Sequence, residues 1–232
     1  MTLRKLFLPM MAAVGLLAGM TACNSGDDPG NMSPTYANIV TLKNINGQSM
    51  TVDYMPGQFK DIVTLTCQAI DTTGVVTIGG RFLIAYQLPE GMEVNQSGAV
   101  TLLAYQKVVN GSPKLVDMTE YATWGNTIAQ VNDMSMSNTY LNVGVQMPSS
   151  SLGQSIQLLV DKNTLTTETA EMYVYVQSPS SDMTYTTVRY ASFDLAAFKY
   201  QNPNVKKITV HSPNQSIITT YDLYPGVVPS DN

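Results

Sequence analysis

Few of the residues that build catalytic and metal sites occur in this sequence. Its 232 residues include one histidine, two cysteines and one tryptophan, and 12% of them are charged. A zinc site uses several Cys or His ligands, and a serine nucleophile activated by imidazole would have to use His211. There is no Gly-rich phosphate loop, no Gly-x-Ser-x-Gly, no Cys-x-x-Cys and no His-Glu-x-x-His. We therefore expect no metal, no cofactor and no catalytic residue.

Positive charge is scarce as well. The formal net charge is −5, and beyond the first residues the only adjacent cations are Lys206 and Lys207. Because nucleic-acid affinity comes mainly from neutralising phosphates, we expect no nucleic-acid partner. A carboxylate pair for glycoside hydrolysis needs only proximity in space, so the sequence leaves that activity open. The carboxylates share no motif and are expected to be solvated: Asp53, Asp61, Asp71, Glu90, Glu93, Asp117, Glu120 and Asp133.

The first 23 residues resemble an export signal. Arg4 and Lys5 precede an apolar run from Leu6 to Met20, and Thr21-Ala22 leads to Cys23. The run has about 15 residues, fewer than the roughly 20 that span a bilayer as a helix. This order predicts a lipoprotein signal peptide over residues 1–22 and a lipid on Cys23. The alternatives are an ordinary signal peptide with a chance cysteine, or a membrane anchor.

A polar stretch follows the predicted lipidation site. Residues 23–35 are rich in Gly, Pro, Ser and Asn, which predicts a flexible tether. Loss of residues 1–22 would remove Arg4 and Lys5 and no acid, so the net charge would fall from −5 to −7. Asp27-Asp28 resembles the acidic tags that direct lipoproteins to the cell surface in Bacteroidetes-type envelopes. We expect an outer-membrane lipoprotein, either surface-exposed or facing the periplasm.

With Cys23 carrying lipid, Cys67 would be the only free thiol. An internal disulfide is then excluded even in an oxidising compartment. Cys67 alternates with Val63, Leu65 and Ala69, which predicts an inward-facing side chain. A buried small hydrophobe is therefore expected rather than a nucleophile. His211 lies on the opposite face of its predicted strand from Ile208 and Val210, which predicts a solvated side chain.

Short segments with period-two alternation and turn residues between them predict an all-β protein. Asn46-Gly47 lies between residues 39–42 and 49–54 and predicts a hairpin. In residues 82–88 the side chains on both faces of the predicted strand are apolar, so this strand should be covered on both faces. The remaining apolar faces are Leu141, Val143, Val145 and Met147, then Ile156, Leu158 and Val160, then Met172, Val174 and Val176, then Ala191, Phe193 and Leu195, then Ile208 and Val210.

Residues 121–127 lack alternation and lie near the middle of the chain. We place a domain boundary there, with a barrel-like domain at 36–120 and a β-sandwich at 128–224. Helical signals are weak. Asp117-Met118-Thr119-Glu120 fits a capping pattern, and a turn or two of helix could continue to Trp124.

Aromatic side chains could form a platform on which a sugar ring stacks, although tyrosines are also ordinary strand residues. The candidates are Trp124, Tyr86, Tyr105, Tyr121, Tyr140, Tyr173, Tyr175, Tyr185 and Tyr190. Asp71-Thr72-Thr73 resembles a bacterial O-glycosylation sequence with Thr72 as the acceptor. A three-residue pattern of this kind often occurs by chance.

Several segments follow one another in an order that is found in a known family: residues 36–42 with 49–54, 79–86, 132–134 with 138–143, 189–195 and 205–210. Their order is similar to that of the NigD-like lipoproteins of Bacteroidetes cell envelopes. The resemblance implies an N-terminal OB-type (oligonucleotide/oligosaccharide-binding) barrel followed by an immunoglobulin-like β-sandwich. Residues 55–78 make a longer link than the resemblance implies, which leaves the barrel register open. The family name refers to a bacteriocin locus and implies no activity.

These observations favour a non-enzymatic envelope lipoprotein that is held to the membrane by its lipid anchor and presents a surface to a protein or a glycan. One alternative is a subunit or accessory of a surface or fimbrial assembly, in which an edge strand pairs with a neighbour. A second is an immunity-type protein associated with a bacteriocin locus. A third is a glycan hydrolase with two carboxyl groups about 5–10 Å apart in a cleft.

Overall fold

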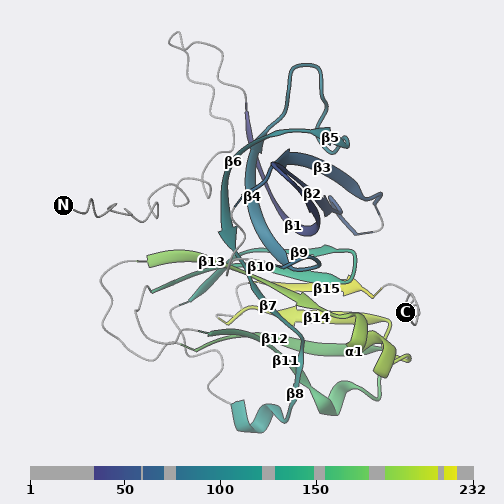
Figure 1. Cartoon of the computed structure of the whole chain (residues 1–232). Helices are drawn as coiled ribbons and strands as arrows, with labels where there is room; N and C mark the ends of the chain where they lie inside the picture. Colours follow the sequence, from purple (N-terminus) through teal and green to yellow (C-terminus); the bar gives the residue numbers. More distant parts are fainter. Residues whose placement is uncertain are drawn as a thin grey trace, which may run out of the picture.

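The computed structural model describes residues 34–58, 60–70, 77–121, 129–148, 155–177, 186–213 and 217–223. These residues form an all-β protein with three sheets and short helices, as the alternation predicts. Figure 1 shows one sheet above the other two, with β9, β10 and β13 in the layer next to it.

The first sheet has the strand order β5-β3-β2-β1-β4-β6. All neighbouring strands are antiparallel except β3 and β5, which are parallel. Both edge strands, β5 and β6, are consecutive in the chain with only Val100 between them. The bounds are β1 Thr35–Asn46, β2 Ser49–Tyr54, β3 Val63–Gln68, β4 Arg81–Gln87, β5 Gly98–Ala99 and β6 Thr101–Lys107.

The hairpin predicted at Asn46-Gly47 is confirmed with its turn shifted by one residue. Asn46 still pairs with Ser49, so the two loop residues are Gly47 and Gln48. Gly47 has φ +59°, a backbone conformation that glycine adopts without steric cost, as the first central residue of a type II′ turn requires. The glycine therefore sets the register of the pair.

The first sheet encloses its own core. Its inward-facing residues follow the predicted parity, and Val63 and Leu65 are buried beside Cys67, which is 5% exposed. Burial raises the pKa of the Cys67 thiol to about 11, so it remains protonated at neutral pH and is a poor nucleophile. The prediction of a buried, unreactive cysteine is confirmed.

Two further sheets pack around one shared core. The four-stranded sheet has the order β7-β13-β10-β9, and the five-stranded sheet has the order β15-β14-β12-β11-β8. Residues of both sheets contribute to the same buried cluster. The bounds are β7 Val109–Gly111, β8 Lys114–Val116, β9 Gln130–Ser137, β10 Tyr140–Pro148, β11 Ser155–Asp161, β12 Thr169–Gln177, β13 Thr186–Asp194, β14 Lys207–His211 and β15 Ile218–Asp222.

Two short strands pair with partners much later in the chain. β7 pairs in parallel with β13, and β8 pairs in parallel with β11. Both precede the predicted boundary at residues 121–127, and both pair with strands that follow it. That boundary itself lies largely outside the described residues and stays a prediction.

The helices are short. The capping pattern at Asp117 corresponds to a 3₁₀ helix, η2 Met118–Tyr121, and Asp117 Oδ1 accepts the Thr119 N–H at 3.2 Å. A second 3₁₀ helix, η3, spans Lys162–Thr164. The α-helix α1 spans Ala196–Gln201 and was not predicted, because six residues are too few to show a helical period.

β4 and β10 are each buried on both faces. For β4 this was predicted, and Leu83 and Ala85 are 6% and 5% exposed. For β10 the sequence indicated one apolar face, yet Asn142 and Gly144 on the opposite face are also buried. The reason is that this polar face of β10 lies against the first sheet.

Arg81 connects the first sheet to the four-stranded sheet. It begins β4, and its Nε donates to Ser192 Oγ on β13 at 2.8 Å, while Nη2 donates to Asn142 Oδ1 on β10 at 3.0 Å. Within its own sheet, Nη1 donates to Thr41 Oγ1 at 3.1 Å. The guanidinium also lies over the Tyr140 ring, 4.2 Å from its centroid. One side chain thus binds three strands besides its own.

The Arg81 side chain is 3% exposed and has no carboxylate within ion-pair distance among the described residues. Burial lowers the pKa of Arg81 to about 10, although Tyr140 and Asp194 act in the opposite direction. The group therefore remains charged at neutral pH. Its desolvation is offset by hydrogen bonds from the rigid guanidinium fork, which a lysine could not reproduce.

We predict that Arg81→Met strongly destabilises the protein. The substitution leaves Asn142 and Ser192 buried with fewer partners, and each buried polar group left without a partner costs about 1–3 kcal/mol. Urea unfolding at neutral pH measures the change. The matched control is Lys43→Met, because Lys43 is exposed and pairs with Asp53 at 3.4 Å on the surface, where such pairs contribute about 0–1 kcal/mol. Equal losses for the two variants would contradict the prediction.

Candidate binding cleft between the sheets

A cleft of about 220 Å³ lies between the first sheet and the four-stranded sheet. One wall comes from β1, β4 and the segment after β2, and includes Ala37, Ile39 and Leu83. The other wall comes from β9, β10 and β13, and includes Asp133 and Tyr190. One wall is therefore largely apolar and the other carries polar side chains.

Strand register places the polar wall in rows that cross three strands. Gly144 on β10 pairs with Asp133 on β9 and with Tyr190 on β13. Two residues along, Asn142 pairs with Ser135 and Ser192. Cross-strand neighbours share one face of a sheet, so the row of Asp133, Gly144 and Tyr190 borders the row that binds Arg81.

Asp133 is the charged residue of this wall. More than a third of its surface is exposed, yet protein atoms around its carboxyl displace water. This desolvation raises the pKa of Asp133, against a smaller opposite effect of a hydrogen bond from the Met134 N–H. Its charge also adds to burial in raising the pKa values of Tyr190 and Tyr221. Both phenols therefore lie within the field of one carboxylate.

Hydrogen bonds fix the segment that closes the cleft after β2. Ser137 Oγ donates to the Met55 carbonyl at 3.0 Å and accepts the Met55 N–H at 3.4 Å. On the first sheet, Asn38 Nδ2 donates to the Tyr86 hydroxyl at 2.8 Å. The two Ser137–Met55 contacts connect the walls, and the Asn38–Tyr86 contact orders the first sheet.

The cleft has one carboxylate among the described residues that line it, Asp133. Glycoside hydrolysis by the usual mechanism uses two carboxyl groups across the scissile bond. The described residues of the lining supply one of these two groups.

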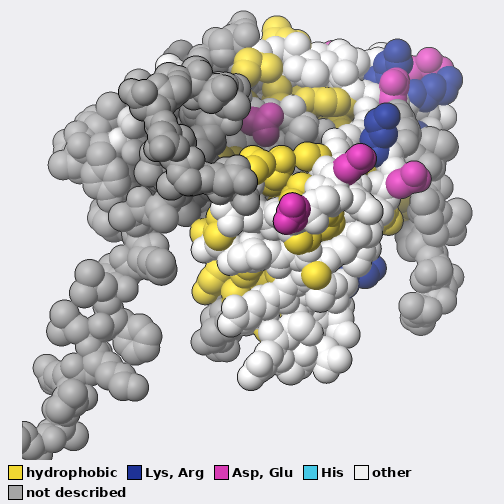
Figure 2. All heavy atoms as spheres, turned by 90° about the horizontal axis from the view of Figure 1, so that it is seen from above, with side chains coloured by type: hydrophobic (Ala, Val, Ile, Leu, Met, Phe, Trp, Pro, Cys, Tyr) yellow, Lys and Arg dark blue, Asp and Glu magenta, His cyan; other side chains and the backbone are white. Residues whose placement is uncertain are grey.

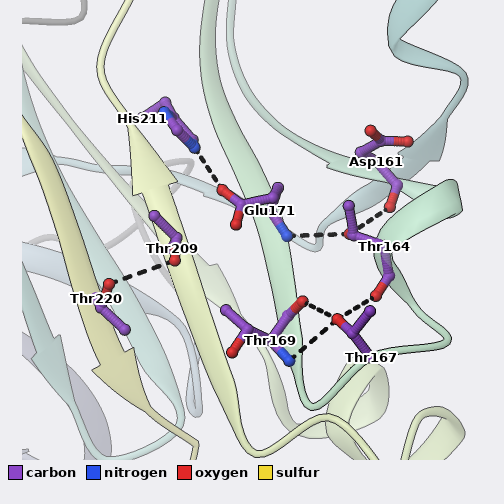
Figure 3. Close-up of polar contacts among 8 residues, drawn as sticks. All are labelled: Asp161, Thr164, Thr167, Thr169, Glu171, Thr209, His211 and Thr220. Atoms are coloured by element: carbon purple, nitrogen blue, oxygen red, sulfur yellow. Dashed lines mark hydrogen bonds and ion pairs between the residues drawn. The ribbon is translucent and has the colours of Figure 1, made fainter.

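The outer face of the five-stranded sheet holds the only histidine (Figure 3). His211 Nε2 lies 2.5 Å from Glu171 Oε2, and its ring stacks on Tyr173 with 4.6 Å between centroids. The His211 side chain is 20% exposed. It lies on the outer face as predicted, but the expectation of a solvated histidine is wrong because Glu171 and Tyr173 on the adjacent strand enclose it.

Threonine hydroxyls connect this face to the turn after β11 (Figure 3). Thr164 Oγ1 donates to the Asp161 carbonyl at 2.7 Å and accepts the Glu171 N–H at 3.0 Å. Thr209 and Thr220 approach within 3.3 Å across β14 and β15. The threonine hydroxyls are thus hydrogen-bonded to groups of the protein itself, which is typical of a surface with a structural role.

The tyrosines predicted as a sugar platform do not share one surface among the described residues. Tyr86 is 1% exposed and belongs to the core of the first sheet. Tyr140 lies beneath Arg81 and Tyr190 lines the cleft. Tyr121 of η2 packs edge-to-face on Tyr175 of β12, with 5.5 Å between ring centroids.

Several predicted sites lie outside the described residues: Cys23, Thr72, Trp124 and Tyr185. Within the described ranges, no group of three or more His, Cys, Asp or Glu side chains could hold a metal ion. No helix in the same ranges is long and apolar enough to cross a bilayer.

Sequence reasoning missed the residues that form the cleft. Asp133 was grouped with the solvated carboxylates, and Arg81, Asn142 and Gly144 were given no role. One local signal existed for Arg81, a cation that begins a strand with both faces apolar. A cation at this position is either buried in its charged form or lies where the burial of the strand ends.

Solved structures share this fold. A protein of unknown function from Bacteroides vulgatus matches with a TM-score of 0.58 at 19% identity, over 86% of this chain and 96% of its own. A candidate lipoprotein from Bacteroides fragilis matches with a TM-score of 0.54 at 12% identity, over 83% and 98%. A NigD-like immunity protein from Bacteroides caccae matches with a TM-score of 0.52 at 18% identity, over 84% and 97%.

At these identities the similarity shows a common fold. No protein-family model matches the sequence, and no curated protein matches it. The resemblance to NigD-like lipoproteins that the sequence indicated is therefore confirmed at the level of the fold.

We predict that Asp133→Asn stabilises the protein at neutral pH. Because the pKa of Asp133 is raised on folding, the folded state binds its proton more tightly than the unfolded state does. Stability from this group is complete below the ordinary pKa of aspartate and is lost as the pH rises through the higher folded value. Asparagine avoids that loss, so the variant should unfold at higher urea concentration at pH 7.

The difference between Asp133→Asn and the native chain should shrink as the pH falls below the ordinary range of aspartate. Asp61→Asn, on an exposed residue outside the cleft, is the control and should leave stability unchanged. A destabilised Asp133→Asn at pH 7 would refute the assigned electrostatics.

Proposed function

We propose that this protein is a non-enzymatic lipoprotein of the cell envelope that binds a protein or a glycan in the cleft between the sheets. The order of residue types from Arg4 to Cys23 supports the lipid anchor, and a candidate lipoprotein with the same fold supports the location. The outer membrane is the expected site of anchoring. The cleft is the observation that carries the binding role.

We infer that the finer architecture is an OB-type barrel followed by an immunoglobulin-like sandwich. In the first sheet, β5 pairs with β3 in parallel and β6 pairs with β4. If β5 and β6 are counted as one interrupted strand, the first sheet has the strand order of a five-stranded, partly open Greek-key barrel. Two sheets around one core support the sandwich.

The surface charge supports a partner other than nucleic acid. In the view of Figure 2, which looks onto the first sheet from above, apolar side chains gather centrally and acidic ones stand singly around them. The Lys and Arg side chains visible on that face gather mainly at one edge beside acidic groups. A nucleic-acid surface would instead need clustered cations without acidic neighbours, so that they can neutralise phosphates.

We predict that lipidation requires Cys23. Cells given radiolabelled palmitate should incorporate label into the native chain and not into Cys23→Ala, which should leave the membrane fraction. Cys67→Ala is the matched control, because Cys67 is buried in the first core, and this variant should keep the label. Label on Cys23→Ala would contradict the lipoprotein assignment.

Occlusion of the cleft should abolish partner capture. Ser135 lines the cleft at the exposed surface of β9, so Ser135→Trp would fill the space without entering a core. Gln130→Trp on the same strand is exposed and lies outside the lining, and serves as the control. Affinity capture from intact cells, combined with surface proteolysis, should lose the partner in the first variant only and should report the exposed side. Equal capture by both variants would contradict a binding role for the cleft.

A further inference from the structure

The carboxylate of Asp133 has no cationic partner among the residues that the structure describes. By contrast, Asp117 and Asp222 lie 3.3 and 3.8 Å from lysine ammonium groups. The Asp133 carboxylate receives the Met134 N–H. A partly desolvated carboxylate in a cleft is a frequent feature of binding sites, where a ligand supplies the missing charge.

A glycine lets the Tyr190 ring pack directly against β10 beside this carboxylate. Gly144 pairs with both Asp133 and Tyr190, so it separates the carboxylate from the phenol ring. A Cβ on Gly144 would lie 3.1 Å from Tyr190 Cε1 and 3.6 Å from Asp133 Cβ. Any larger residue would therefore push the Tyr190 ring away from its place beside the carboxylate.

The size and walls of the cleft restrict its occupant. Its volume of about 220 Å³ is below the roughly 300–1,000 Å³ of pockets that enclose a small molecule. The facing wall presents apolar Ala37, Ile39 and Leu83. A long side chain with a methylene stem and a charged end fits this division between an apolar wall and a carboxylate.

We propose that the cleft binds one lysine or arginine side chain of a partner polypeptide. Asp133 is the counter-ion, the ring of Tyr190 contacts the cation through its face, and the wall of Ile39 and Leu83 covers the stem. This inference rests on the proposed function, since it assigns the chemistry of the same cleft. The net charge of −5 attracts a cationic partner from a distance.

Arg81 does not convert the cleft into an anion site. Its guanidinium is 3% exposed and donates to Thr41, Asn142, Ser192 and the Ile39 carbonyl. The charge is thus engaged within the protein. Asp133 is the charged group that faces the open space.

The test is a titration monitored by amide chemical shifts of the whole chain carrying Cys23→Ser. The probe is N-acetyl-lysine N-methylamide, and its neutral counterpart is N-acetyl-norleucine N-methylamide. The lysine probe should shift the Gly144 amide and bind about tenfold more tightly, a difference of about 1.4 kcal/mol. Asp133→Asn should remove this preference, and Asp61→Asn should retain it.

Equal affinities for the two probes, or an unchanged preference in Asp133→Asn, would overturn the proposal. Tighter binding of spermidine than of the lysine probe would overturn the assignment to a polypeptide side chain. If Ser135→Trp abolishes partner capture while the lysine probe causes no shift, this inference fails and the proposed function stands. If Ser135→Trp leaves partner capture unchanged and the lysine probe causes no shift, both this inference and the proposed function fail.

Discussion

A single buried guanidinium fixes how the first sheet sits on the rest of the protein. Arg81 donates to Thr41 on its own side and to Asn142 and Ser192 on the other. Polar groups buried in a low dielectric strongly favour the one arrangement that satisfies them all. The two walls of the cleft are the same strands that hold these acceptors, so the width of the cleft depends on this network.

Local alternation was sufficient to predict most strands and the first core. The parity of Val63, Leu65 and Cys67 gave the inward face of β3, and the doubly apolar segment at residues 82–88 predicted that β4 is covered on both sides. Both follow from the period of a strand, which depends only on near neighbours. The hairpin was found one residue from its actual turn, since Gly47 rather than Asn46 is its first central residue.

The interface and the cleft could not be predicted in the same way. Ser192 and Arg81 are 111 positions apart, and Asn142 and Arg81 are 61 apart, so no periodic pattern relates them. Asn142 and Gly144 appeared to belong to a solvated face because they alternate with apolar residues. Only tertiary packing shows that a second sheet covers that face, and that Gly144 accommodates the Tyr190 ring beside Asp133.

Residues 109–116 connect the first sheet to both later sheets, which limits where the chain can be divided into fragments. This stretch leaves the first sheet and adds one strand to each of the two later sheets, through β7 and β8. A fragment that starts at residue 128 would leave β13 and β11 with bare backbone edges, and such edges invite self-association. The carboxy-terminal half as a soluble unit would have to start before Val109.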